Sequence, residues 1–561
     1  MLIIILSIIS KVSRLFKKIV EFFANIYLLS PQQKIQKIYS VMFMLQRFLS
    51  LYIFFIFCFM VLLGRIFYIA KTDYSQVIAR QGSRTVTVGE KRGEILDRNF
   101  SPLVGAESKL IAVVTPCAGS YEYLKGKADD AYLREKIENA SPFTIETDTE
   151  INNEFIRTFS VSQRYTADQT ALHLIGYTDS SGKVGVSGIE KAYNNYLSEN
   201  SGKLTVTFQV DAIGRVLAGM NKYINDDNFT SMAGVVLTID KTLQKATEAA
   251  LQTSRIKSGC AIVMSAHSGE ILAMASVPTY DPNNLAKSLN ADNSPFVNKA
   301  LMSYSVGSIF KPVVAACAME NGISPTTEYE CKGKTTVGDK VFSCYDDKSH
   351  GKINMTEALE VSCNCYFINL MDKIDSDHLL KICKDIGLGQ EQTLAPGLKS
   401  ASGTLPTNDS LRLKGALANF LFGQGDFLAT PLQIATVYHT LATGNAVTPK
   451  AILGLTNYMG LMTKEPISPQ IKVLSDKTVI KLQKMLSSAG KSYNLTDASG
   501  KTGTAQSGIY KGGAETLRTW FAGYYPVKNP EYIIVVLNEK GTSGTADCVP
   551  VFREISEALK R

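Results

Sequence analysis

Internal repeats and low-complexity tracts are absent from the 561-residue sequence, and a strong charge excess is missing as well. The net charge of +8 is modest for this length, and much of it lies before residue 66. A basic excess beside an apolar run is typical of a membrane surface and not of a nucleic-acid interface. With 45% hydrophobic and 20% charged residues, the composition is globular, and the length allows two sizeable cores and an anchor.

Acidic residues are nearly missing ahead of the main apolar run, where only Glu21 opposes seven basic residues: Lys11, Arg14, Lys17, Lys18, Lys34, Lys37 and Arg47. The run itself, Phe48 to Gly64, continues through Ile66 to Ala70 and is long enough to span a bilayer. The positive-inside rule places the N-terminus in the cytoplasm and everything after Ala70 outside. Because no small-residue cleavage site follows the run, a membrane anchor fits better than a cleaved signal peptide.

The first 41 residues leave two alternatives open. Met1 to Ile9 is apolar but too short to span a membrane, and Lys11 to Leu29 is expected to form a cationic amphipathic helix on the membrane surface. Translation from Met42 or Met44 would remove both segments.

The rest of the chain is expected to form two domains, an N-terminal domain at 71–230 and a larger one at 231–561, after a basic segment at 1–47 and the anchor at 48–70. The first is rich in short strands and glycine turns. The second opens at Val235 with a strand and an amphipathic helix, followed by a hairpin from Cys260 to Ser276. It closes with strands at 516–525 and 532–538 and a helix from Val549 to Arg561. Strands at both ends with helices between them predict an antiparallel sheet with a helical insertion, an α+β fold.

One S-x-x-K pattern stands apart from several chance occurrences in the chain. Gly307 precedes Ser308, Pro312 suits a first helical turn, and an apolar run follows Lys311. Ser308 is therefore expected to begin a buried helix, on which the Lys311 amine can reach the serine hydroxyl three residues away. A lysine in a dry site can lose its proton near neutral pH and serve as the base that a serine nucleophile needs.

Two further short patterns follow in the chain. Ser362-Cys363-Asn364 is an S-x-N, which is common by chance, whereas the K-T-G of Lys501, Thr502 and Gly503 occurs once, before Thr504. On an edge strand, Gly503 has no side chain to block a substrate backbone, and Lys501 offers a positive charge to a substrate carboxylate.

The three patterns, in this order, resemble those of penicillin-binding transpeptidases and serine β-lactamases. Their intervals of 54 and 139 residues suit the transpeptidases. Ala261 to Asn283 and Gly423 to Gln433 are similar to segments of the same family. Arg92 to Asn99 and His173 to Lys191 resemble the N-terminal pedestal domain of its class B members, whose roles in elongation, division or sporulation the sequence leaves open.

The resemblance implies the transpeptidase fold: a five-stranded antiparallel sheet with flanking helices and a helical subdomain, after the pedestal and one transmembrane helix. It implies that Ser308 attacks the penultimate D-Ala carbonyl of a peptidoglycan stem peptide and that Lys311 takes its proton. Ser362 would relay a proton to the leaving D-Ala amine, while Asn364 orients Lys311. Lys501, Thr502, Gly503 and Thr504 would bind the terminal carboxylate, and the N–H groups of Ser308 and Thr504 would form the oxyanion hole. β-Lactams would acylate the same serine, and a membrane glycosyltransferase is the expected partner.

Cys331, Cys344, His350 and Cys363 form a possible zinc site, with spacings of 13, 6 and 13 residues. Three thiolates and one imidazole match a closed tetrahedral Zn²⁺ site in ligand type. Some class B penicillin-binding proteins that this sequence resembles carry zinc here, and Cys365 could replace Cys363. A Cys331–Cys344 disulfide, free buried thiols, or His350 as a plain turn residue are the alternatives. A bound zinc would pin the loop that carries Ser362 and Asn364.

Other functional classes fit less well. The large N-terminal domain and the lack of an obvious added carboxylate for deacylation argue against a β-lactamase, and residues 1–47 are too short for the signalling domain of a β-lactam sensor. A strand-rich 71–230 argues against a class A enzyme with a glycosyltransferase domain, and the intact motifs argue against a non-catalytic scaffold. The four remaining histidines are expected to be structural, as are Arg92, Asp97 and Arg98; these histidines are His173, His267, His378 and His439.

Overall fold

The computed structural model describes residues 30–71, 82–217, 219, 221–511 and 513–560, with scattered positions between 10 and 24. Two compact units make up the chain, Met1–Ser83 and Arg84–Arg561. The predictions for 1–9 and for most of the amphipathic helix at 11–29 lie outside the described residues.

Helix α2 (Pro31–Lys71) contains the predicted span and extends it by 17 residues toward the N-terminus. It begins at a proline, which suits the first helical position because that N–H would lack an intrahelical partner anyway. Its most apolar window has a mean hydropathy of 2.4 with no side chain buried, and it is the one candidate membrane span among the described residues. Met42 and Met44 both lie inside α2, so a chain that started at either would begin within this helix.

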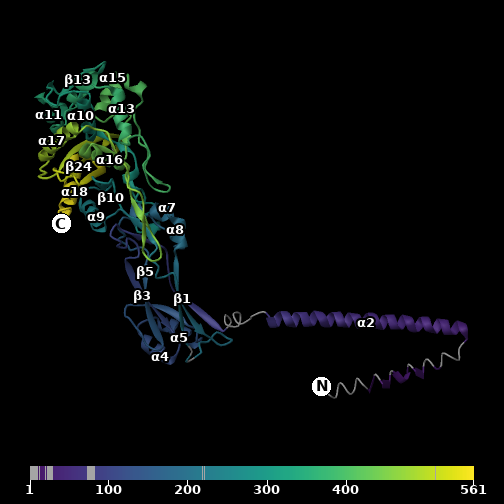
Figure 1. The fold of residues 1–561 in the computed structure, drawn as a ribbon. Helices are drawn as coiled ribbons and strands as arrows, with labels where there is room; N and C mark the ends of the chain where they lie inside the picture. Colours follow the sequence, from purple (N-terminus) through teal and green to yellow (C-terminus); the bar gives the residue numbers. More distant parts are fainter. Residues whose placement is uncertain are drawn as a thin grey trace. The chain divides into compact units, whose positions relative to one another are not determined.

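The first part of the second unit is rich in strands, as predicted, and these strands form two small sheets (Figure 1). One has the order β4-β3-β5 and packs with two short helices, α4 and α5, around a core that includes Val114 and Phe143. The other has the order β1-β6-β7. The bounds are β1 (Ser83–Lys91), β3 (Glu107–Val114), α4 (Ala118–Leu124), α5 (Asp130–Glu138), β4 (Phe143–Thr147), β5 (Ile156–Gln163), β6 (Gly202–Gln209) and β7 (Tyr223–Asp227).

A third sheet joins distant parts of the unit in the order β2-β8-β20-β21. Strand β2 (Glu94–Leu96) pairs in parallel with β8 (Gly234–Leu237), which pairs with β20 (Ile452–Thr456), itself paired with β21 (Met462–Lys464). A Cβ on Gly234 would lie 2.4 Å from the carbonyl oxygen of Glu94, so this close approach requires glycine. The boundary at 230/231 stays a prediction, and a strand from each side of it belongs to this sheet.

The central sheet is antiparallel and five-stranded, in the order β10-β9-β25-β24-β23. Its strands are β9 (Gly259–Ser265), β10 (Ile271–Val277), β23 (Ser499–Lys511), β24 (Ala514–Tyr525) and β25 (Tyr532–Gly541). Alternate residues of β9 and β25 enter two different cores, because successive side chains of a strand point to opposite faces. Both faces are therefore covered, and the predicted α+β layer with its five-stranded sheet is confirmed.

Helices cover both faces of this sheet (Figure 1). One face packs against α9 (Lys241–Thr253) and α18 (Gly544–Ala558), and the other against α16 (Pro431–Thr443). Helix α17 (Asp476–Ser492) lies along β23, and α10 (Lys311–Glu320) is buried along almost its whole length. Helix α18 begins five residues before the predicted Val549, and the Asp547 carboxylate in its first turn accepts the backbone N–H groups of Thr542 and Ser543 just ahead of the helix.

Candidate active site

The serine of the S-x-x-K pattern lies in a tight 3₁₀ turn, η3 (Gly307–Phe310), and α10 begins only at Lys311. Ser308 therefore lies in the first turn of a buried helical segment, as expected, and this segment starts as a 3₁₀ turn that continues directly as α10. Gly307 has φ +68°, a left-handed conformation that favours glycine, and a Cβ there would lie 2.8 Å from the carbonyl oxygen of Thr504. The turn thus brings the serine against strand β23.

Contacts from three other segments hold this turn. The Gly307 N–H donates to the carbonyl of Gly423 at 2.8 Å, and the Tyr438 hydroxyl donates to the carbonyl of Ile309 at 3.0 Å. The Trp520 indole N–H donates to the carbonyl of Ser305 at 3.0 Å. A Cβ on Gly423 would lie 2.0 Å from the Gly307 carbonyl oxygen, which explains the glycine in the family-like segment 423–433.

The ammonium of Lys311 meets the S-x-N segment, which lies at the start of α12 (Asn364–Asn369). Its Nζ donates to the Ser362 carbonyl at 2.6 Å and to Asn364 Oδ1 at 2.7 Å, and lies 3.3 Å from Ser362 Oγ. The Asn364 amide is oriented by its own N–H, which donates to the Ser343 carbonyl at 2.9 Å. Ser362 has φ +56°, a strained conformation for a residue with a side chain and one that gathers at functional sites.

Burial and, to a smaller extent, the positive charge of Lys501 together lower the pKa of Lys311 to about 7, against the opposing effect of nearby thiols. A substantial fraction of this amine is therefore neutral near pH 7, as a general base requires.

The K-T-G segment lies on β23, which is the edge strand of the central sheet as predicted. Thr502 and Thr504 line the cavity, whereas Lys501 is fully buried beneath it, because successive strand residues point to opposite faces. The Lys501 Nζ donates to the Thr502 carbonyl at 3.1 Å and to Tyr493 Oη at 3.3 Å. Tyr493 is a site residue that sequence reasoning missed, since it belongs to no motif.

Gly503 is required by packing behind the strand. A Cβ there would lie 2.9 Å from Ile309 Cγ2 and 3.2 Å from the carbonyl oxygen of Val306. The glycine therefore lets β23 approach the turn η3 that carries Ser308. This is a second reason for a glycine at this position, beside the predicted access for a substrate backbone.

These segments enclose one cavity of about 870 Å³. Its lining includes Ser308, Ser362, Asn364, Thr502 and Thr504, while the Lys311 ammonium reaches it through its contact with Ser362. The structure thus brings together the residues that the three patterns predicted. A nucleophile, a lysine that can be neutral and a set of hydroxyl groups in one cleft can perform acyl transfer.

Beside the cavity, Cys331, Cys344, His350 and Cys363 point their ligand atoms at one another, all within 4.8 Å. The Sγ atoms of Cys331 and Cys344 are 3.8 Å apart, those of Cys344 and Cys363 are 3.7 Å apart, and Cys331 Sγ lies 3.4 Å from His350 Nδ1. A tetrahedral zinc with bonds of about 2.3 Å to sulfur needs S···S edges of about 3.8 Å, so the four residues fit this ion. The Cys331–Cys344 distance is too long for a disulfide, whose S–S bond is about 2.05 Å.

Cys365 is a fifth thiol at the same place, with its Sγ 3.6 Å from that of Cys344. Hydrogen-bond contacts with the Cys363 and Cys365 thiols lower the pKa of Cys344 well below its usual value. A thiolate is therefore favoured at the centre of the cluster, which is the form that binds a metal.

The histidines expected to be structural lie outside the residues that line the cavity, whereas His350 of the thiol cluster is among those residues. His173 is buried: its Nε2 lies 2.7 Å from the Pro295 carbonyl oxygen, its ring meets Tyr280 edge-on, and burial lowers its pKa to about 4. His267 lies beside the β9–β10 turn, while His378 and His439 lie in α13 (Ser376–Asp385) and α16.

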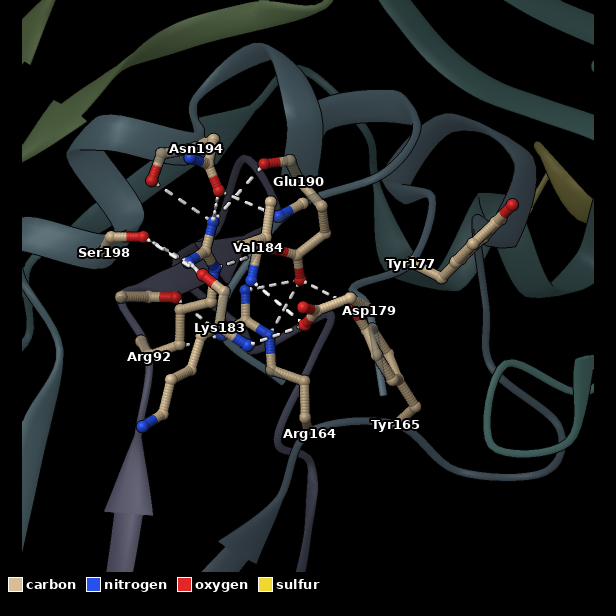
Figure 2. A network of polar contacts seen from close by, with 12 residues as sticks. Arg92, Arg164, Tyr165, Tyr177, Asp179, Lys183, Val184, Glu190, Asn194 and Ser198 are labelled. Atoms are coloured by element: carbon tan, nitrogen blue, oxygen red, sulfur yellow. Dashed lines mark hydrogen bonds and ion pairs between the residues drawn. The ribbon is translucent and has the colours of Figure 1, made fainter. Parts of the chain in front are cut away.

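Arg92 forms a buried ion pair with Glu190 at 3.0 Å (Figure 2). The same carboxylate accepts hydrogen bonds from Arg164 Nε and Tyr165 Oη, both at 2.8 Å. Arg98 pairs with Glu270 at 3.2 Å. The Asp97 carboxylate caps the turn that follows β2 by accepting the N–H groups of Asn99 and Ser101.

Comparisons with known proteins agree with this geometry. The family described as the penicillin binding protein transpeptidase domain matches residues 259–557, more than half of the chain. The peptidoglycan D,D-transpeptidase FtsI of Buchnera aphidicola is 28% identical over 415 residues, which cover 70% of this chain and 68% of that protein.

Two solved structures share the fold. Penicillin-binding protein 3 of Mycobacterium tuberculosis, complexed with aztreonam, superposes with a TM-score of 0.61 at 23% identity, over 85% of this chain and 96% of that one. The second is a chain of a peptidoglycan synthase complex that coordinates polymerization and crosslinking. It superposes with a TM-score of 0.65 at 23% identity, over 91% of this chain and 98% of that one.

Proposed function

We propose that this chain, which belongs to the penicillin-binding protein transpeptidase family, cross-links peptidoglycan stem peptides through an acyl-enzyme on Ser308. It is a serine-type D,D-transpeptidase, and β-lactams acylate it. The observation that carries the assignment of residues is the Lys311 ammonium, held by Ser362 and Asn364 beside the cavity that Ser308 lines.

In the first half of the reaction, Ser308 Oγ attacks the carbonyl carbon of the penultimate D-Ala. Its proton passes to the neutral amine of Lys311, whose pKa of about 7 suits this role. Ser362 Oγ, 3.3 Å from Lys311 Nζ, then carries a proton to the nitrogen of the terminal D-Ala as the C–N bond breaks. The products are an ester on Ser308 and free D-Ala.

In the second half, the amine of a neighbouring stem peptide attacks the ester carbonyl. Its proton returns through Ser362 to Lys311 and then to Ser308 Oγ as the ester bond breaks, which forms the cross-link. A β-lactam follows the first half only, because its ring nitrogen remains tethered to the acyl group and blocks the second amine.

Labelling by a fluorescent penicillin tests this assignment. Full-length protein in membranes should be labelled covalently, and Ser308→Ala should lose the label completely. Ser180→Ala is the matched control, since Ser180 heads an unrelated S-x-x-K in an exposed turn, and it should label like the parent protein. A labelled Ser308→Ala variant would rule out this serine.

We further propose that Cys331, Cys344, His350 and Cys363 hold a structural Zn²⁺. The fit of their spacing to a tetrahedron supports this, as does the favoured thiolate at Cys344. The ion would supply no chemistry to the acyl transfer. Its four ligands would tie β12 (Tyr329–Cys331) to the start of α12 and so hold Ser362 and Asn364 in place.

Metal analysis of the purified protein should find one zinc per chain, and Cys344→Ser should lose it together with most penicillin labelling. Cys117→Ser is the control, because Cys117 lies at the start of α4, outside this cluster, and should keep both. A zinc-free wild-type protein that labels fully would contradict the proposal.

The orientation and the partner complete the proposed function. The basic residues before α2 support a cytoplasmic N-terminus with the catalytic unit outside. The similarity to a chain of a peptidoglycan synthase complex supports work beside a membrane glycosyltransferase. A cysteine-reactive reagent that cannot cross membranes should label a cysteine introduced at Ser180 in whole cells, and exclusion of the reagent would reverse the orientation.

A further inference from the structure

Tyr493 is the one tyrosine whose hydroxyl contacts both Lys501 and Thr502 in the described part of the chain. It lies at the C-terminal end of α17, directly before the turn that leads into β23. Its Oη is 2.9 Å from Thr502 Oγ1 and accepts a hydrogen bond from Lys501 Nζ at 3.3 Å. Thr502 lines the catalytic cavity, so this hydroxyl is one side chain away from the space that a substrate occupies.

The backbone and ring of Tyr493 are fixed from several sides. Its N–H donates to the Gly490 carbonyl at 3.0 Å, and its carbonyl accepts from Arg553 in α18 at 3.2 Å. The ring packs edge-on against Phe521 of β24, with centroids 5.7 Å apart. Ring packing and hydroxyl contacts are therefore separable, because phenylalanine could keep the first and lose the second.

The Tyr493 hydroxyl is one of the few hydrogen-bond acceptors of the Lys501 ammonium. Lys501 is fully buried, and among the described residues no carboxylate lies within 4 Å of its Nζ. An ammonium carries three donors, and here the acceptors are the Thr502 carbonyl, the Thr502 hydroxyl at 3.4 Å and Tyr493 Oη. A buried donor that loses its partner is costly, so the Tyr493 hydroxyl contributes to where this charge sits.

The electrostatics agree with this coupling. Burial raises the pKa of Tyr493, but the Lys501 charge and the hydrogen bonds with Thr502 and Lys501 outweigh it, so the pKa lies below the usual value. The same Lys501 charge lowers the pKa of Lys311.

We propose that Tyr493 is a positioning residue whose hydroxyl orients the Lys501 ammonium and the Thr502 hydroxyl toward the terminal carboxylate of the substrate. This inference rests on the proposed function, in which Lys501 and Thr502 bind the terminal carboxylate of the stem peptide. Because Tyr493 acts through Lys501 and Thr502, loss of its hydroxyl should weaken substrate binding more than it slows the chemical step.

A pair of thioester substrates separates this role from a purely structural one. Both are N-acyl-D-alanyl thioesters, but the leaving group ends in a carboxylate in one and in a primary amide in the other. Tyr493→Phe in the full-length protein should lower kcat/KM for the carboxylate substrate about tenfold, mainly through KM, as expected for a hydrogen bond to a charged group. For the amide substrate, kcat/KM should change less than threefold. The ratio of the two values is internal to each preparation and does not depend on the folded fraction.

Tyr524→Phe is the matched control, because Tyr524 is a fully buried tyrosine on β24 whose hydroxyl meets the Gln483 carbonyl outside the cavity. It should leave the ratio unchanged. Equal losses on both substrates in Tyr493→Phe, or no loss on either, would overturn the positioning role. A wild-type protein that neither turns over a thioester nor binds penicillin would instead contradict the proposed function itself.

Discussion

At the scale of single residues, the two lysines of the cavity differ in what surrounds their ammonium groups. Lys311 contacts the Ser362 carbonyl and the Asn364 amide oxygen, whereas Lys501 contacts Tyr493 and Thr502. Each is fully buried, and the positive charge of Lys501 raises the electrostatic cost of charging Lys311. The pKa of Lys311 is lowered to about 7, which suits the role of a general base.

The first prediction concerns pH. Because the lowered pKa of Lys311 lies near 7, the amine is protonated and inactive as a base below that value. The rate of acylation by a penicillin should therefore rise with pH and level off above about pH 7, falling about tenfold per pH unit on the acid side. Stopped-flow acylation between pH 5 and 9 measures this, and a rate independent of pH over that range would contradict it.

The second prediction concerns Gly503. An alanine there would place its Cβ 2.9 Å from Ile309 Cγ2 and push the nucleophile turn away from β23. Gly503→Ala should reduce the rate of penicillin acylation by about ten- to a hundredfold, as a misplaced catalytic group does. Gly415→Ala is the control, since the nearest atom to its Cβ is a flexible lysine carbon at 3.8 Å, and it should acylate like the parent.

At the scale of elements, short segments from separate parts of the chain depend on one another. The turn η3 is held by β24 through Trp520, by α16 through Tyr438 and by the Gly423 carbonyl. In the same way, one buried carboxylate, Glu190, connects the strand end at Arg92 with the segment that carries Arg164 and Tyr165. Loss of such a shared partner should affect several elements together.

The third prediction is that Glu190→Gln destabilises the protein strongly. It removes the negative charge between two guanidinium groups, and breaking a buried ion pair on one side costs about 3–5 kcal/mol. The free energy of unfolding in urea should fall by that amount. Glu391→Gln removes an exposed partner of Lys399 and should change it by less than about 1 kcal/mol. Equal effects of the two substitutions would show that the network contributes no more than a surface pair.

At the scale of the whole molecule, the chain divides at the end of the membrane segment. Apart from Ser83 at the start of β1, the sheets that the structure describes and the active-site cavity lie in the unit Arg84–Arg561. The catalytic unit therefore has its own hydrophobic cores, and we expect it to fold by itself.

The fourth prediction follows from this division. A protein that begins at Arg84 should be soluble and should acylate with penicillin within about threefold of the rate of the full-length chain. Gel filtration and stopped-flow acylation measure the two properties. An aggregated or unreactive product would show that the membrane segment contributes to the folding of the catalytic unit.

Local patterns in the sequence predicted much of this protein. The apolar run predicted the long apolar helix α2, and further apolar segments predicted the strands and helices at both ends of the second domain's sequence. The order of three short motifs predicted the family, because the chemistry of acyl transfer requires these residue types in one cleft. These features depend on residues close together in the chain or on their order alone.

Tertiary structure decided the contacts between distant residues. Tyr493 became part of the site because α17 ends beside β23, and the Lys501 side chain became buried beneath the cavity, with its ammonium beside Thr502, because strand side chains alternate between faces. The reason for Gly503 emerged only where Ile309, almost two hundred residues earlier, packs behind it. The sequence by itself determined the residue types of the three motifs and their order, which predict the groups that perform the chemistry, and the packing of segments far apart in the chain determined where each group points.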